Sequence, residues 1–124
     1  MFFLDSSGRE KRQYIRIPYR ETVNFYSLNE PEAERKTHEA KAQNISLGGM
    51  LFLTGYKFSP YEEIHLEFKL QYPGNIVKMN LWAQVVWMEV TQSNDLYSVG
   101  VKFQNLSQQQ KDELAAFVQS SLKK

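Results

Sequence analysis

The alternation of apolar and polar residues constrains this chain more than any other feature of its sequence. Between positions 62 and 70 an apolar side chain stands at every second place: Ile64, Leu66, Phe68 and Leu70. Successive side chains of a β-strand point to opposite faces of the sheet, so this two-residue period predicts a strand with one buried face. Comparable patterns predict strands over residues 16–25, 39–46, 50–54, 76–90 and 97–103. The chain is therefore expected to be an all-β domain of six strands.

The segment 76–90 is the longest of the predicted strands. Up to position 87, one of its faces carries only apolar residues: Val77, Met79, Leu81, Ala83, Val85 and Trp87. Strict alternation therefore places Trp87 on the same face as Val85. Trp82 falls on the opposite face, where it is expected either under a helix or on a partner surface.

The spacing of apolar residues changes near the C-terminus to that of a helix. Ser107 stands three residues before Gln110, which is the spacing of a capping box. Apolar residues then recur at helical intervals: Leu114, Phe117, Val118 and Leu122. Turn residues separate the predicted strands at positions 48–49, 72–75 and 93–95. Six antiparallel strands followed by one helix favour a barrel or a sandwich.

Length, cysteine content and charge limit the class of protein. The 124 residues predict a single domain. The absence of cysteine excludes disulfides and favours a cytoplasmic location. The apolar run at residues 1–4 is too short for a signal peptide or a membrane span. A net charge of +1 argues against a general DNA or RNA binder.

Basic residues gather near the N-terminus despite this near-neutral total. Five of them fall within twelve positions that contain a single acidic residue: Arg9, Lys11, Arg12, Arg16 and Arg20. A local basic cluster suggests a small anionic ligand rather than a long polyanion. Arginine suits phosphates and guanine edges because its planar guanidinium donates paired hydrogen bonds. On spacing alone, Arg12 and Arg16 could equally belong to a solvated basic arm.

A second polar cluster lies farther along the chain. Asn44 and Ser46 are two residues apart, so on a strand they share a face, whereas Ile45 points into the core. An amide can recognise a purine edge, and a hydroxyl can donate or accept a hydrogen bond. Gly48 and Gly49 would let a ligand approach the backbone. The alternative is a strand end followed by ordinary turn residues.

Together and in this order, the two clusters resemble the motifs of the PilZ family. Its Arg-x-x-x-Arg motif is matched by residues 12–16, and its Asp/Asn-x-Ser-x-x-Gly motif by residues 44–49. Residues 16–18, 82–87 and 99–103 also resemble the family's first strand, a late core strand and its ending. The resemblance implies a six-stranded antiparallel β-barrel with a C-terminal α-helix. It divides the chain into an N-terminal tail at 1–8 and a single PilZ domain at 9–124.

The resemblance also implies a ligand, the second messenger cyclic di-GMP. The implied binding residues are Arg12, Arg16, Asn44, Ser46, Gly48 and Gly49. The two arginines would clamp phosphates and guanine, the asparagine and serine would hydrogen-bond a guanine, and the glycines would keep the approach open. Auxiliary candidates surround the first arginine: Arg9, Lys11 and Gln13. In the family, the position of Lys11 influences whether one ligand or a stacked pair binds.

The implied protein is a non-catalytic receptor that relays its signal to a partner protein, which the sequence does not identify. The intact arginine pair favours this role over a PilZ-type adaptor that binds no nucleotide. A small nucleic-acid-binding barrel is the third alternative, because aromatic residues make up 14% of the chain. The regulated process, the oligomeric state and the number of ligands per protomer stay open.

Patterns of catalysis and metal binding are weak in this sequence. His38 and His65 show no ligand spacing typical of zinc. Ser46 lacks the nucleophile elbow of hydrolases. Glu62 and Glu63 are adjacent, so on a strand they face opposite sides and form a poor acid–base pair. Neither enzymatic activity, nor a metal or other cofactor, nor membrane insertion is expected.

Overall fold

A computed structural model describes residues 2–3, 15–93 and 95–123 of the chain. Six strands are long, and β1 and β2 have two residues each. The elements in chain order are β1 (Phe2–Phe3), β2 (Ile17–Pro18), β3 (Thr22–Ser27), the 3₁₀ turn η1 (Glu32–Glu34), β4 (His38–Ile45), β5 (Gly49–Thr54), β6 (Glu63–Tyr72), β7 (Asn75–Val90), β8 (Tyr97–Gln104) and α1 (Gln108–Leu122). The first predicted strand is thus divided into β2 and β3.

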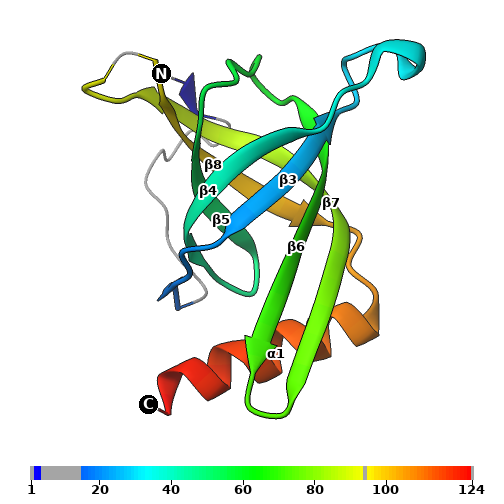
Figure 1. The fold of residues 1–124 in the computed structure, drawn as a ribbon, viewed down its shortest axis with the longest axis vertical. Helices are drawn as coiled ribbons and strands as arrows, with labels where there is room; N and C mark the ends of the chain where they lie inside the picture. Colours follow the sequence, from blue (N-terminus) through cyan, green and yellow to red (C-terminus); the bar gives the residue numbers. More distant parts are fainter. Residues whose placement is uncertain (1, 4–14, 94, 124) are drawn as a thin grey trace.

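The six long strands form one closed antiparallel barrel (Figure 1). Neighbouring strands follow the order β7–β6–β3–β4–β5–β8, and β8 pairs again with β7, which closes the sheet. The short strands extend this sheet, because β1 pairs with β7 and β2 pairs with β4. The expected six-stranded barrel with a C-terminal helix is confirmed. The sandwich alternative is excluded because the sheet closes on itself.

The interior of the barrel is filled by the apolar face of each long strand. On β6 the burial alternates as expected, with Ile64 and Leu66 fully buried and Glu63 exposed. Phe25 and Phe52 are among the largest fully buried side chains, and their rings stack with centroids 5.9 Å apart. Burial of apolar surface is the main favourable term in folding. This core therefore gives the outward-facing side chains a rigid frame.

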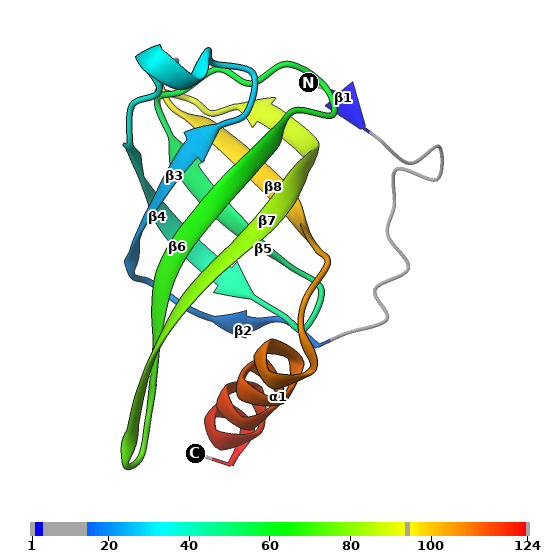
Figure 2. The same cartoon turned by 90° about the vertical axis from the view of Figure 1, so that its right-hand side faces the viewer.

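The helix α1 covers one end of the barrel, beside a long hairpin formed by β6 and β7 (Figure 2). Ser107 and Gln110 form the predicted capping box at its start. Its apolar face is buried through Leu114, Phe117 and Val118. A two-residue turn joins the hairpin strands, and its Gly74 has a φ of +80°, which glycine adopts without strain. None of the described helices is long and apolar enough to cross a bilayer.

The long strand β7 departs from strict alternation at one point. Its register against β8 shifts between Val85 and Trp87, which marks a β-bulge. Val85 and Met88 are buried, whereas Trp87 is only partly buried and pairs with Gly100 on the outer surface. The prediction that Trp87 shares a face with Val85 was therefore wrong. One extra residue in a strand moves the following side chains to the other face.

Candidate functional site

The approach of the chain to the barrel brings the two sequence motifs together. β2 places Ile17 opposite Ile45 and Pro18 opposite Asn44. Both isoleucines are buried, so they anchor this crossing. Arg16 immediately precedes β2, and its Nη1 donates a hydrogen bond to Asn44 Oδ1 at 3.2 Å. Two motifs that lie far apart in the sequence thus meet on the outside of the barrel.

Asn44 belongs to a row of residues that crosses four strands. It pairs with Leu51 of β5, which pairs with Gly100 of β8, which in turn pairs with Trp87 of β7. The residues next to this row that are buried in the core come from all four strands, namely Ile45, Met50, Phe52, Met88, Val99 and Val101, so this row faces outward. These four residues and Arg16 are called the Asn44–Trp87 face below.

The indole of Trp87 lies next to Gly100. A Cβ at Gly100 would lie 3.6 Å from Trp87 Cβ and 3.8 Å from Trp87 Cε3, so the indole lies against the glycine backbone. An indole offers a broad π surface on which a nucleotide base can stack. The amide of Asn44 can both donate and accept at a base edge. The face thus combines a stacking surface, an amide and a guanidinium.

The turn between β4 and β5 holds the second motif. Ser46 is only 6% exposed, its Oγ accepts a hydrogen bond from the Gly48 N–H at 3.1 Å, and its own N–H donates to the Gly49 carbonyl at 2.9 Å. A Cβ at Gly49 would lie 2.2 Å from the Val101 carbonyl oxygen, so a glycine is needed for β5 to pair closely with β8. These contacts give Ser46 and Gly49 a structural role, and their contact with a ligand stays a prediction.

The other candidate residues cannot be placed in this way. Arg9, Lys11, Arg12 and Gln13 lie outside the described residues. Their roles, and those of Arg16 and Asn44 in binding, remain predictions. What the structure contributes is the contact of Arg16 with Asn44 and the outward row of residues that joins Asn44 to Trp87.

Sequence reasoning missed Trp87 as a candidate, although a signal was present. Val85, Val86, Trp87 and Met88 are four consecutive apolar residues, which strict alternation cannot place on one face. Such a run inside an alternating strand can mark a bulge. Trp82, in contrast, lies on the outer surface, 38% exposed and packed against His65 at 4.7 Å between ring centroids.

The carboxylate of Glu62 is buried away from this face, and both of its oxygens accept hydrogen bonds within the fold. Glu62 accepts hydrogen bonds from Ser27 Oγ, from the Tyr56 hydroxyl at 3.0 Å and from the Ser59 N–H at 2.8 Å. Burial is the main cause that raises the pKa of Tyr56. These bonds tie the loop after β5 to β3. Among the described residues, no group of histidines and acidic side chains is arranged to hold a metal ion.

Comparison with known families and sequences gives one clear result. The PilZ domain family matches residues 10–120, which is most of the chain. No match was found among curated protein sequences.

Comparison with solved structures shows the same fold. The inhibitor of motility from Bacillus subtilis (MotI/DgrA) aligns with a TM-score of 0.72 at 18% identity, over 94% of this chain and 53% of that one. The PilZ domain of YcgR from Escherichia coli, determined with c-di-GMP, gives 0.64 at 17% identity, over 92% and 93%. The complex of K. pneumonia MrkH with c-di-GMP gives 0.64 at 11% identity, over 90% and 52%. The chain therefore spans about half the length of the motility inhibitor and of MrkH.

Proposed function

The chain belongs to the PilZ domain family, and we propose that it is a receptor for cyclic di-GMP which relays the signal to a partner protein. The observation that carries the proposal is the hydrogen bond between Arg16 and Asn44, because it joins the family's two motifs at the edge of the Asn44–Trp87 face. Two structural neighbours, YcgR and MrkH, were determined with this ligand bound.

In this proposal the ligand lies across the Asn44–Trp87 face. The indole of Trp87 stacks on one guanine, and the amide of Asn44 hydrogen-bonds the edge of that base. Arg12 and Arg16 bind the phosphates through their paired donors. They also bind the edge of guanine that Asn44 does not contact. Arg16 exchanges its bond to Asn44 for stronger, charge-assisted bonds to the ligand. The auxiliary residues Arg9, Lys11 and Gln13 add further donors.

The proposed role is non-catalytic, as the family's role as an effector domain implies. The output passes to a partner protein, which is not yet identified. The sequence contains no cysteine, which fits a protein that works in the reducing cytoplasm.

Isothermal titration of cyclic di-GMP into the protein, with GMP as the control ligand, tests the proposal. We expect saturable binding that is selective over GMP. Arg16→Ala should lower the affinity about ten- to a hundredfold, because a charge-assisted hydrogen bond contributes about 1.5–3 kcal/mol. Arg20→Ala is the matched control, since Arg20 has the same spacing from Arg16 as Arg12 but lies outside the motif.

Three outcomes would contradict this proposal. A folded protein that gives no heat with cyclic di-GMP would favour the adaptor that binds no nucleotide. Binding to oligonucleotides with an affinity that falls steeply as the salt concentration rises, and without preference for the cyclic dinucleotide, would favour a nucleic-acid-binding barrel. Unchanged affinity in the Arg12→Ala/Arg16→Ala double variant would show that the site lies elsewhere.

A further inference from the structure

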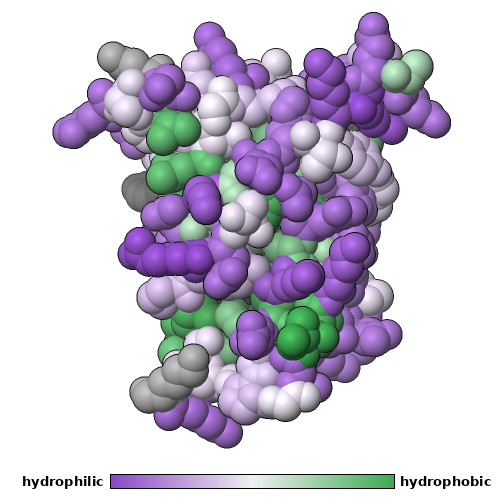
Figure 3. All heavy atoms as spheres, in the orientation of Figure 1, coloured by the Kyte–Doolittle hydropathy of each residue, from purple (hydrophilic) through white to green (hydrophobic). Residues whose placement is uncertain are grey.

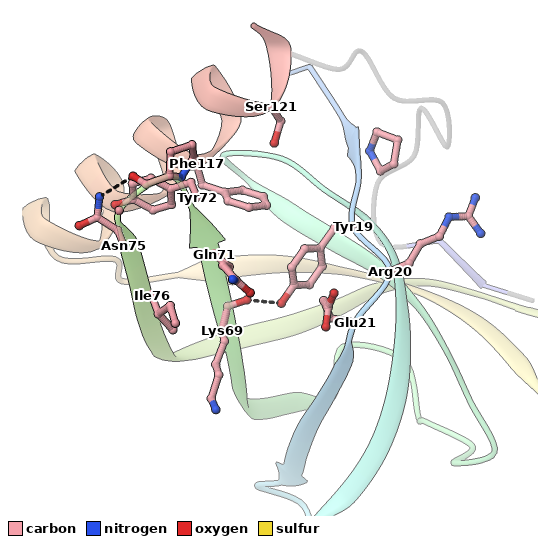
Figure 4. Close-up of a pocket in the computed structure, with 13 residues that line it drawn as sticks. Tyr19, Arg20, Glu21, Lys69, Gln71, Tyr72, Asn75, Ile76, Phe117 and Ser121 are labelled. Carbon is pink, nitrogen blue, oxygen red and sulfur yellow. Dashed lines mark hydrogen bonds between the residues drawn. The ribbon is translucent and has the colours of Figure 1, made fainter. Parts of the chain in front are cut away.

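A concave region lies at the opposite end of the β2 segment from Arg16. It is a groove of about 1030 Å³ between the β6–β7 hairpin, α1 and residues 18–21 (Figure 4). Its floor is aromatic. The ring of Phe117 lies edge-on to Tyr19 at 5.8 Å and to Tyr72 at 6.3 Å between centroids. This region is called the hairpin groove below.

One wall of the hairpin groove is the edge of a strand without a full partner. β6 pairs with β7 over its whole length, from Glu63 to Tyr72. On its other side, β6 pairs with β3 only as far as Glu67. On the side away from β7, residues 68–72 therefore have no neighbouring strand among those the structure describes. This edge lines the groove together with the hairpin turn.

The backbone of Gln71 is directed to this edge. In an antiparallel strand, alternate residues direct their N–H and C=O groups to the same neighbour. The Glu63 carbonyl accepts from the Leu28 N–H at 2.9 Å, and the Lys69 carbonyl accepts from the Tyr19 hydroxyl at 2.5 Å. Both bonds lie on the side of β6 away from β7, so Gln71 presents its groups there too. Among the described residues, no backbone hydrogen bond joins Gln71 to residues 18–21.

The outer surface of the hairpin beside this edge is positively charged. Lys69 and Lys78 are directly opposite each other in the β6–β7 register, and both are exposed. Like charges in this arrangement repel one another. Glu21 also lines the groove and Glu67 shares the outer face of β6 with Lys69, yet within the described part of the chain neither lysine forms a salt bridge. A carboxylate supplied from outside would relieve this repulsion.

From these observations we infer that the hairpin groove is a docking site for an extended, acidic segment of a partner protein, added as a strand to the β6 edge at Gln71. Two backbone hydrogen bonds to Gln71 fix the segment. Its acidic side chains lie on the outer face near Lys69, and its alternate, apolar side chains enter the aromatic floor at Tyr72 and Phe117. The recognised pattern is an alternation of acidic and apolar residues.

A second copy of this chain fits the edge less well than an acidic partner. Two hairpins joined edge to edge would place four lysines on one face of the joint sheet, and like charges oppose such pairing. Hydrophobic surface lies on the same end of the molecule (Figure 3), where Ile76 on the hairpin is 70% exposed. A partner with both carboxylates and apolar side chains satisfies both features.

The test uses the full chain and three synthetic nine-residue peptides. The first alternates glutamate with valine around a central phenylalanine, the second has lysine in place of glutamate, and the third has the first composition in scrambled order. Fluorescence polarisation measures affinity, and ¹H–¹⁵N spectra locate the binding. We expect saturable binding of the first peptide only, with the shifted amides at residues 69–72 and in α1.

Two variants and their matched controls test the two parts of the site. Gln71→Pro removes the N–H that faces the groove but none that pairs with β7, and should weaken binding about fivefold. Its control, Gln71→Ala, keeps the N–H and should bind as the parent does. Lys69→Glu should weaken binding about tenfold. Its control is Lys111→Glu, an exposed lysine on α1.

The proposal is overturned if the scrambled peptide binds equally, if Gln71→Pro and Lys69→Glu leave the affinity unchanged, or if the shifted amides lie elsewhere. It is also overturned if sedimentation shows a dimer of the protein that Gln71→Pro dissociates, because a second copy is then the occupant. Since none of these measurements requires cyclic di-GMP, their outcome does not depend on the proposed receptor function.

Discussion

The Asn44–Trp87 face and the hairpin groove lie at opposite ends of one short segment, residues 16–21, yet they offer a ligand different chemical groups. Under the Asn44–Trp87 face, β4, β5, β8 and β7 are each paired on both sides. Their backbone groups are used in the sheet, so recognition there falls to side chains. In the hairpin groove, β6 extends past its partner β3, so backbone groups are available.

This difference teaches what each region can recognise. Side chains on a closed sheet can be specific for a small planar ligand, because an indole, an amide and a guanidinium each contact a different part of it. An open strand edge is suited to another polypeptide, since only an extended chain matches its spacing of donors and acceptors. One barrel can thus present a ligand site and a partner site without overlap.

The largest expected effect tests the closed sheet beneath the Asn44–Trp87 face. Gly49→Val would force β5 and β8 apart, because the Cβ position lies 2.2 Å from the Val101 carbonyl oxygen. Overpacking of this kind lowers the free energy of unfolding by about 3 kcal/mol. Urea denaturation measures it, with Gly100→Ala as the control, since a Cβ there lies 3.6 Å from Trp87. Equal losses in both variants would show that close pairing at Gly49 is not the cause.

The next effect separates the two tryptophans of the outer surface. Trp87→Ala should weaken cyclic di-GMP binding by about 2 kcal/mol, roughly thirtyfold in Kd, because a stacking surface is lost. Trp82→Ala should leave the affinity unchanged, since Trp82 packs against His65 on another row. Calorimetric titration of both variants decides between them. If the Trp82 variant binds as poorly as the Trp87 variant, the ligand does not lie on the proposed face.

A smaller effect is expected at the edge of the hairpin groove. Tyr19→Phe removes the hydrogen bond to the Lys69 carbonyl and should lower the free energy of unfolding by about 1 kcal/mol. Burial raises the pKa of Tyr19, so its hydroxyl stays protonated and able to donate at neutral pH. Thermal unfolding measures the loss. Cyclic di-GMP affinity should not change, and a change would mean that the two regions are coupled through residues 18–21.

The smallest effect concerns the charge of the hairpin alone. Lys78→Glu replaces a cross-strand repulsion with Lys69 by an attraction and should raise the free energy of unfolding by about 0.5 kcal/mol. The gain should disappear in 1 M salt, where the Debye length is about 3 Å. Lys102→Glu is the control, because its cross-strand neighbours Gly49 and Gln84 carry no charge. A gain of equal size in that variant would point to the total charge of the protein instead.

The sequence alone determined which residues of β6 enter the core and where the helix begins. Burial on β6 follows the two-residue period, and the capping box formed at Ser107 as predicted. These features depend on neighbours one to four positions away, so the local pattern is sufficient. The two motifs were also visible from the sequence, because their residue types and spacing are local properties.

The tertiary structure alone decided which of these residues meet. The contact of Arg16 with Asn44 depends on the pairing of β2 with β4, and the outward position of Trp87 depends on a bulge in β7. The hairpin groove exists because β6 extends beyond the end of its pairing with β3. No local pattern in the sequence reveals this difference in length. Strand pairing, register and bulges are set by hydrogen bonds and packing between segments distant in sequence, and these arise only when the whole barrel closes.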